Sequence, residues 1–170
     1  MSTMSHPERP APSAVSAADA ASQEEDGLFL TTSALPKVRT ANAVDWEALT
    51  TQARIAMTKA YVPYSKYPVG AAALLTDGSV ISGCNVENAS YGLTLCAECT
   101  LVGQLQMNGG GKIAAFTCVN REAEYITPCG RCRQLLHEFA APTLHIRTAA
   151  GITSLEKLLP ESFGPDDLES

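Results

Sequence analysis

Two Cys-x-x-Cys pairs constrain the fold of this chain more than any other feature: Cys96 with Cys99, and Cys129 with Cys132. Each pair stands at the start of a predicted helix, where free backbone N–H groups and the positive end of the helix dipole favour the thiolate. Cysteines three residues apart share one helix face, so Cys129 and Cys132 can bind one metal ion, with Cys96 as a third ligand. The pattern predicts a fold in which the starts of two helices meet around a metal.

The rest of the sequence alternates between predicted helices and strands. Asp45 is a good N-cap, and Thr94 and Thr127 are the expected N-caps of two later helices. Pro128 suits the first position of the second of these helices. The predicted elements are a helix at 46–60, strands at 69–75 and 80–86, a helix at 95–107, a strand at 113–120, a helix at 128–140, a strand at 143–148 and a short helix at 154–159. This order, αββαβαβα, predicts an α/β fold: a three-layer α/β/α sandwich with a mixed sheet.

The first 44 residues differ in composition from the remainder. They are rich in Ala, Ser and Pro, contain Phe29 as their one aromatic residue, and show no helical or strand period. Such a segment buries too little apolar surface to offset its ordering entropy. We therefore expect a disordered tail over 1–44 and a single catalytic domain over 45–168.

Charge and hydropathy restrict the partners and the compartment. The chain has 12 Lys and Arg against 18 Asp and Glu, a net charge of −6, which disfavours binding to nucleic acid. No apolar run is long enough to span a membrane, and the N-terminus lacks a secretory pattern. We expect a cytoplasmic protein without a membrane partner, whose six cysteines stay out of disulfides.

Three kinds of protein could carry the two cysteine pairs. A closed four-cysteine structural zinc site has this spacing, and so does a thiol oxidoreductase that cycles one pair without metal. Two features favour a catalytic zinc instead. The chain is 45% hydrophobic, which is enough for a full core that needs no structural zinc to stabilise it. Glu98 lies inside the first pair, where a hydrolytic zinc site needs a proton carrier.

The motifs around the cysteines match a known signature. Cys96-Ala97-Glu98 and Pro128-Cys129-Gly130-Arg131-Cys132 fit the zinc deaminase pattern of a ligand, any residue and Glu, followed by Pro-Cys-x-x-Cys. Three further segments match in order, at 61–72, 85–91 and 163–168. Over 45–168 the sequence resembles the cytidine deaminases, specifically their small-subunit, three-cysteine, homotetrameric branch.

The resemblance implies a function and a set of site residues. It implies hydrolytic deamination of cytidine and deoxycytidine to uridine and deoxyuridine in pyrimidine salvage, with release of ammonia. It implies one zinc ion per subunit, bound by Cys96, Cys129 and Cys132, with Glu98 as the proton shuttle. It also implies a homotetramer with shared active sites, in which Phe163 reaches the nucleoside bound by a neighbouring subunit. The implied substrate-binding residues are Tyr67, Asn85, Glu87, Ala89, Tyr91 and Phe163.

Cys99 departs from the family pattern, which usually has arginine at that place. A fourth thiolate would close the open position of the zinc, so we expect Cys99 to remain a neutral thiol, with Arg131 or Arg133 supplying positive charge. A deaminase that edits tRNA or DNA shares the metal motif. The acidic balance of the chain and the segment containing Asn85 and Glu87 argue against that alternative.

Overall fold

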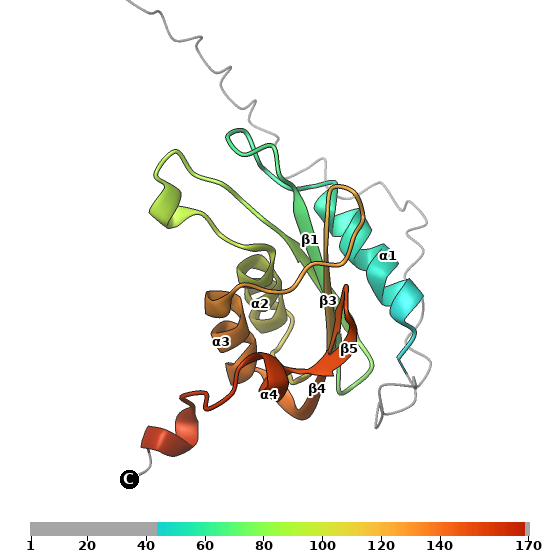
Figure 1. Ribbon diagram of the computed structural model, residues 1–170, viewed down its shortest axis with the longest axis vertical. Helices are drawn as coiled ribbons and strands as arrows, with labels where there is room; N and C mark the ends of the chain where they lie inside the picture. Colours follow the sequence, from blue (N-terminus) through green and yellow to red (C-terminus); the bar gives the residue numbers. More distant parts are fainter. Residues whose placement is uncertain (1–43, 169–170) are drawn as a thin grey trace, which may run out of the picture. The chain divides into compact units, whose positions relative to one another are not determined.

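The computed structural model describes residues 44–168, which fold around one mixed five-stranded sheet (Figure 1). The predicted tail lies outside the described residues, apart from Val44. The elements are α1 (Trp46–Met57), β1 (Val69–Leu75), β2 (Val80–Cys84), η3 (Tyr91–Leu93), α2 (Ala97–Met107), β3 (Ile113–Asn120), α3 (Gly130–Glu138), β4 (Ala140–Thr148), β5 (Gly151–Ser154), α4 (Leu155–Leu158) and η4 (Pro165–Leu168). Within the described range, no helix is long and apolar enough to cross a membrane.

The strands lie in the order β2-β1-β3-β4-β5. β1 is antiparallel to both β2 and β3, β3 is parallel to β4, and β4 is antiparallel to β5. Helix α1 covers one face of this sheet, while α2, α3 and α4 cover the other (Figure 1). The predicted three-layer α/β/α sandwich with a mixed sheet is therefore confirmed.

Successive side chains of the central strands β1 and β3 point to opposite faces of the sheet, so they contribute to two separate core clusters. Ala71 and Phe116 belong to the cluster beneath α2 and α3, whereas Ala72 and Ala115 belong to the cluster beneath α1. All four side chains are fully buried. Because helices cover both faces, β1 and β3 are mainly apolar rather than alternating between apolar and polar residues, with Thr117 and Asn120 as the polar exceptions in β3.

The structure corrects the predicted order of elements at the C-terminal side. The strand β5 follows β4 directly through a tight turn at 149–150, and its first residue, Gly151, has a φ of 117° that favours glycine, so the order is αββαβαββα. Its four residues were too few to show a strand period. β4 also starts earlier than predicted, because Pro142 lies in a register shift of the β3–β4 pairing that needs no N–H donor there.

The helix boundaries differ as well. Helix α1 has the predicted N-cap, Asp45, whose side chain accepts a hydrogen bond from the Ala48 N–H at 2.9 Å, but it ends at Met57. Helices α2 and α3 are capped by Cys96 and Cys129 themselves, not by Thr94 and Thr127. The predicted first helical position of Pro128 is wrong for the same reason, because α3 begins after Cys129.

Gly83 allows α2 to lie directly against β2. A Cβ atom at Gly83 would stand 2.4 Å from the Leu101 backbone N and 2.5 Å from the Ala97 carbonyl O. Because these are backbone atoms of α2, the first turns of the helix would have to move. We expect Gly83→Ala to lower the free energy of unfolding by about 3 kcal/mol, measured by urea denaturation.

Gly103 provides the matched control for this prediction. It lies in the same helix, and a Cβ atom there would meet nothing within 4 Å. Gly103→Ala should raise the free energy of unfolding by up to about 1 kcal/mol through helix propensity. Equal effects of the two substitutions would contradict the close approach of β2 and α2.

Candidate functional site

Three cysteine side chains meet where α2 and α3 begin. The Sγ atoms of Cys96, Cys129 and Cys132 all lie within 4.8 Å of one another. A tetrahedral zinc with Zn–S bonds of about 2.3 Å needs sulfurs about 3.8 Å apart, so small side-chain movements suffice. Cys132 is buried, Cys96 is half-buried and Cys129 is exposed, which leaves one side of the group open. The donor set fits a zinc ion with three protein ligands and one open position.

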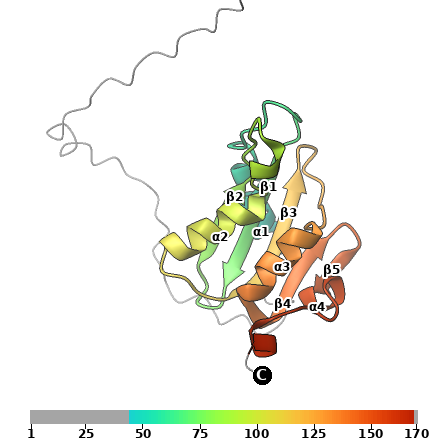
Figure 2. The same ribbon diagram turned by 90° about the vertical axis from the view of Figure 1, so that its left-hand side faces the viewer.

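Local backbone structure brings these cysteines together. Cys96 and Cys129 have extended backbones, with ψ angles of 159° and 167°, and each caps the helix that follows it. The backbone of Leu95 pairs with Val86 through two hydrogen bonds of 2.9 Å, which holds the entry to α2 against the chain leaving β2. Helices α2 and α3 then run side by side over the sheet (Figure 2).

Glu98 lies in the first turn of α2 and is only 4% exposed. Burial raises the pKa of its carboxyl group above the ordinary value. Regular helical spacing would turn Cys96 and Glu98 to nearly opposite sides. Because Cys96 is the extended cap rather than a helical residue, both side chains instead line one cavity.

In the absence of metal, the three thiols have different pKa values. Burial raises the pKa of Cys132 far above its ordinary value, and burial also raises the pKa of Cys96. Burial opposes ionisation of Cys129 too, but interactions with the backbone N–H and thiol of Cys132 outweigh it and lower the pKa of Cys129. The effect expected at helix starts therefore acts on Cys129, while a metal would have to deprotonate the other two thiols.

A cavity of about 190 Å³ opens beside the cysteines. It is smaller than the roughly 300–1,000 Å³ that is typical of small-molecule sites. The lining residues come from β1, the chain that leaves β2, the start of α2 and the entry to α3: Val69, Asn85, Thr94, Leu95, Cys96, Ala97, Glu98, Ile126, Thr127 and Cys129.

Asn85 reaches this cavity, whereas Glu87 does not line it. The Asn85 Oδ1 accepts a hydrogen bond from the Val69 N–H at 2.8 Å, and its Nδ2 donates to the Tyr67 carbonyl at 2.9 Å. Glu87 accepts hydrogen bonds from the backbone N–H groups of Tyr64 and Ser65, at 2.9 and 3.2 Å. Interactions with Ser65 and Tyr64 lower the pKa of Glu87, so this carboxylate stays ionised. Both side chains hold the loop at 61–67 in place.

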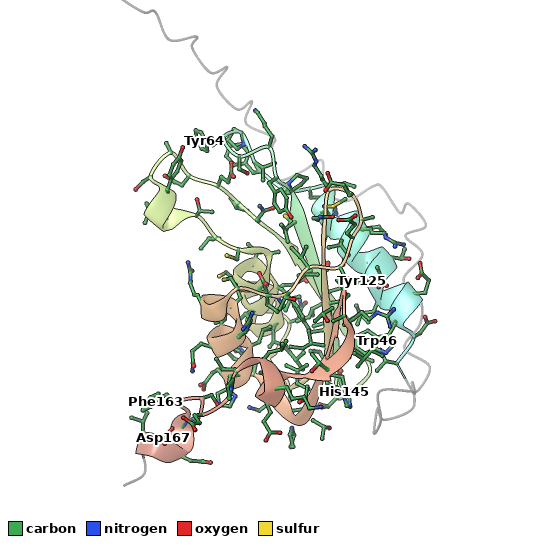
Figure 3. The ribbon with its side chains drawn as sticks, in the orientation of Figure 1. Trp46, Tyr64, Tyr125, His145, Phe163 and Asp167 are labelled. Carbon is green, nitrogen blue, oxygen red and sulfur yellow. The ribbon has the colours of Figure 1, made fainter. Side chains whose placement is uncertain are left out.

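The other four predicted substrate-binding residues lie outside the cavity in a single chain. Tyr67 and Ala89 are exposed, Tyr91 is 76% exposed and Phe163 is 60% exposed. Figure 3 shows Phe163 at the opposite end of the molecule from Tyr64, which contacts Glu87 through its backbone. The structure therefore gathers Cys96, Cys129, Cys132, Glu98 and Asn85 within one chain and leaves the rest at the surface.

Sequence reasoning missed the role of the two threonines. Thr94 and Thr127 line the cavity instead of capping helices. Each stands two residues before a cysteine cap on extended backbone, and residues two apart on such backbone point to the same side. Recognising the cysteines as caps would have placed both threonines beside the three converging cysteines.

Cys99 lies apart from the three converging sulfurs. Its thiol accepts a hydrogen bond from the Arg131 Nη2 at 3.4 Å. Arg133 is engaged elsewhere, because its guanidinium donates to the carbonyls of Pro128 and Leu158. Of the two arginines expected to supply charge, Arg131 is therefore the one in contact with the first cysteine pair.

Comparisons with known proteins agree with this geometry. Residues 44–148 match a family model described as the cytidine and deoxycytidylate deaminase zinc-binding region. A curated cytidine deaminase of Mycobacterium tuberculosis is 52% identical over 125 residues, covering 74% of this chain and 94% of that protein. One of Sporosarcina psychrophila is 38% identical over 130 residues, covering 74% and 96%.

Solved structures show the same likeness. The crystal structure of a cytidine deaminase from Mycobacterium tuberculosis superposes with a TM-score of 0.69 at 51% identity, covering 71% of this chain and 98% of that one. A cytidine deaminase from Burkholderia pseudomallei gives a TM-score of 0.64 at 42% identity, covering 71% and 100%. These chains share both the fold and much of the sequence described above.

Proposed function

Because this chain belongs to the zinc-binding family of cytidine and deoxycytidylate deaminases, we propose that it deaminates cytidine and deoxycytidine by hydrolysis. The products are uridine and deoxyuridine, with release of ammonia, as a step of pyrimidine salvage. The observation that carries the proposal is the convergence of three thiols, two of which line a cavity together with a buried carboxyl group. Hydrolytic zinc sites need both groups, because the thiols hold the metal and the carboxyl group moves protons.

Cys96, Cys129 and Cys132 would hold the zinc ion, one per subunit. When bound, zinc supplies a nucleophile at neutral pH by lowering the pKa of water. Glu98 would take one proton from the attacking water and deliver it to N3 of the cytosine ring as the water oxygen bonds to C4. The same carboxyl group would then take the second proton from that oxygen and give it to the amino group, which leaves C4 as ammonia, so Glu98 serves as base and acid in turn. Burial suits Glu98 to this role, because it keeps the pKa of the carboxyl above its ordinary value.

Asn85 and Glu87 are proposed to bind the ribose hydroxyls. The Asn85 amide uses one acceptor site and one N–H within the protein, which leaves one of each for substrate. The Glu87 carboxylate accepts hydrogen bonds from two backbone N–H groups and keeps further lone pairs that can accept from the ribose hydroxyls. Tyr67, Ala89 and Tyr91 are proposed to complete the base and sugar contacts from the neighbouring loops.

We further propose a cytoplasmic homotetramer with shared active sites. The partial cavity of one chain supports this arrangement, since a nucleoside needs a larger enclosure. Apolar side chains on the loops beside the cavity and near the C-terminus are unusually exposed: Tyr61, Tyr91, Leu93, Leu95 and Phe163. Burying them against other copies would remove this apolar surface from water.

Mixing two variants tests the shared site. Phe163→Ala should raise KM and lower kcat without releasing zinc, because stacking on the base contributes about 1 kcal/mol beyond burial. Combined with Glu98→Gln subunits, Phe163→Ala subunits should recover activity, since some sites then contain both native side chains. Sedimentation of a fully active monomer, or no recovery in mixed tetramers, would refute shared sites.

The proposed catalytic domain is 45–168, and the preceding segment is proposed to be dispensable. A chain that starts at residue 41 should fold and deaminate cytidine within about twofold of the full-length rate, and limited proteolysis should remove the segment first. Activity and thermal unfolding of the two chains are compared under identical conditions. Loss of folding in the shorter chain would make the segment part of the domain.

An assay of the purified full chain tests the proposed activity. Ammonia and uridine should form from cytidine with about one zinc per chain, while cytosines in tRNA or single-stranded DNA should be untouched. Zinc without turnover would favour the closed structural site, and disulfide exchange without zinc would favour the oxidoreductase.

A further inference from the structure

Helix α3 holds the C-terminal segment through a row of polar side chains. The Gln134 Nε2 donates to the Phe163 carbonyl at 2.8 Å, and the His137 Nε2 lies 3.2 Å from the Ser162 hydroxyl. The preceding residue, Arg133, donates hydrogen bonds to two different segments of the chain. Its Nε donates to the Pro128 carbonyl at 2.8 Å, and its Nη1 donates to the Leu158 carbonyl at 2.9 Å.

We propose that Arg133 is a positioning residue that couples the loop carrying the ligand Cys129 to the segment carrying Phe163. The inference rests on the proposed function, because it assigns roles to zinc and to Phe163. Arg133 itself touches neither the thiol group nor the cavity among the described residues. It acts through the backbone of the two segments that it joins.

The bond to Pro128 orients the ligand next to it. The Pro128 carbonyl belongs to the peptide plane that also contains the Cys129 nitrogen, and Pro128 is fully buried. Fixing that carbonyl therefore fixes the plane from which the Cys129 side chain departs. Outer hydrogen bonds of this kind commonly change metal affinity by 10–100-fold when removed.

The bond to Leu158 fixes the start of the C-terminal segment. Leu158 is the last residue of α4, so its carbonyl has no donor within the helix. Five residues later, the carbonyl of Phe163 is held by Gln134. Two adjacent residues of α3 thus restrain both ends of the chain between α4 and Phe163, and Arg133 also bonds to the loop that carries Cys129.

An arginine is needed for this double contact. The planar guanidinium presents several donors in fixed directions, so one side chain can serve two carbonyls on different segments. A lysine keeps the charge but concentrates it in one ammonium group on a flexible stem. Arg133→Lys therefore removes the bridge while leaving the net charge of the protein unchanged.

The test measures zinc release and substrate affinity separately in the zinc-loaded full chain. Arg133→Lys should transfer zinc to a chromogenic chelator about 10-fold faster than wild type and should also raise the KM for cytidine. Gln134→Leu, which loses only the bond to Phe163, should raise KM without changing zinc transfer. Arg54→Lys is the matched control, because Arg54 lies on α1 and pairs with Glu47, and it should change neither quantity.

Each outcome decides the proposal. Zinc transfer from Arg133→Lys at the wild-type rate would overturn it, as would faster transfer from Gln134→Leu to the same extent. If Arg133→Lys does not fold, Arg133→Gln is measured instead, and slowing of its zinc release by added ethylguanidinium would support the bridge. A wild-type chain that binds no zinc or leaves cytidine unchanged would reject the proposed function itself, which distinguishes the two failures.

Discussion

Glu98→Gln is expected to lower the kcat for cytidine by at least ~100-fold while zinc remains at about one ion per chain. The amide has nearly the shape of the carboxyl group, but it cannot accept a proton from water or deliver one to the base. The proposed zinc ligands are unaffected, since Cys96, Cys129 and Cys132 supply the converging sulfurs. Steady-state kinetics and metal analysis on the same sample measure the two quantities.

The stability of Glu98→Gln separates a chemical effect from unfolding. Glu98 is buried, so a neutral amide at this position avoids the cost of burying a charge. The variant should unfold at the same temperature as wild type or higher. Glu156→Gln, the same substitution at an exposed site on α4, should leave kcat unchanged. Activity of Glu98→Gln within a few-fold of wild type would remove this residue from the mechanism.

Cys96→Ser should abolish zinc retention, whereas Cys99→Ser should preserve it. The Sγ of Cys96 belongs to the group of three sulfurs, and a serine hydroxyl is a poor zinc ligand. Cys99 lies outside that group and accepts a hydrogen bond from Arg131. Both positions are half-buried in the same Cys-x-x-Cys turn, which makes them a closely matched pair.

Zinc per chain after dialysis against a mild chelator measures the difference, and the rate of cytidine deamination should follow it. The reverse result, with Cys99 required and Cys96 dispensable, would point to a different ligand set. Loss of zinc in both variants would indicate a closed four-cysteine structural site and would argue against catalysis at this centre.

Much of the fold follows from local patterns in the sequence. The strands β1 and β3 have the predicted bounds, because continuous apolar runs between turn residues allow little else. Asp45 caps α1 as predicted, through a contact only three residues long. The placement of Cys129 and Cys132 on one turn was also predictable from their spacing, although their meeting with Cys96 depends on how α2 and α3 pack. The short strand β5 was not, because four residues carry too little periodicity.

The sequence by itself therefore determined the sheet-and-helix class, the candidate metal-binding cysteines and the candidate proton carrier. Only the tertiary structure decided how these groups face one another. Pairing between Val86 and Leu95 leaves the chain extended up to Cys96, which turns Glu98 and Thr94 into the same cavity. Contacts across many residues likewise decided that Arg131 reaches Cys99 while Arg133 bridges two segments. These contacts depend on which segments lie side by side in the folded chain, and the periodicity of the sequence does not specify that.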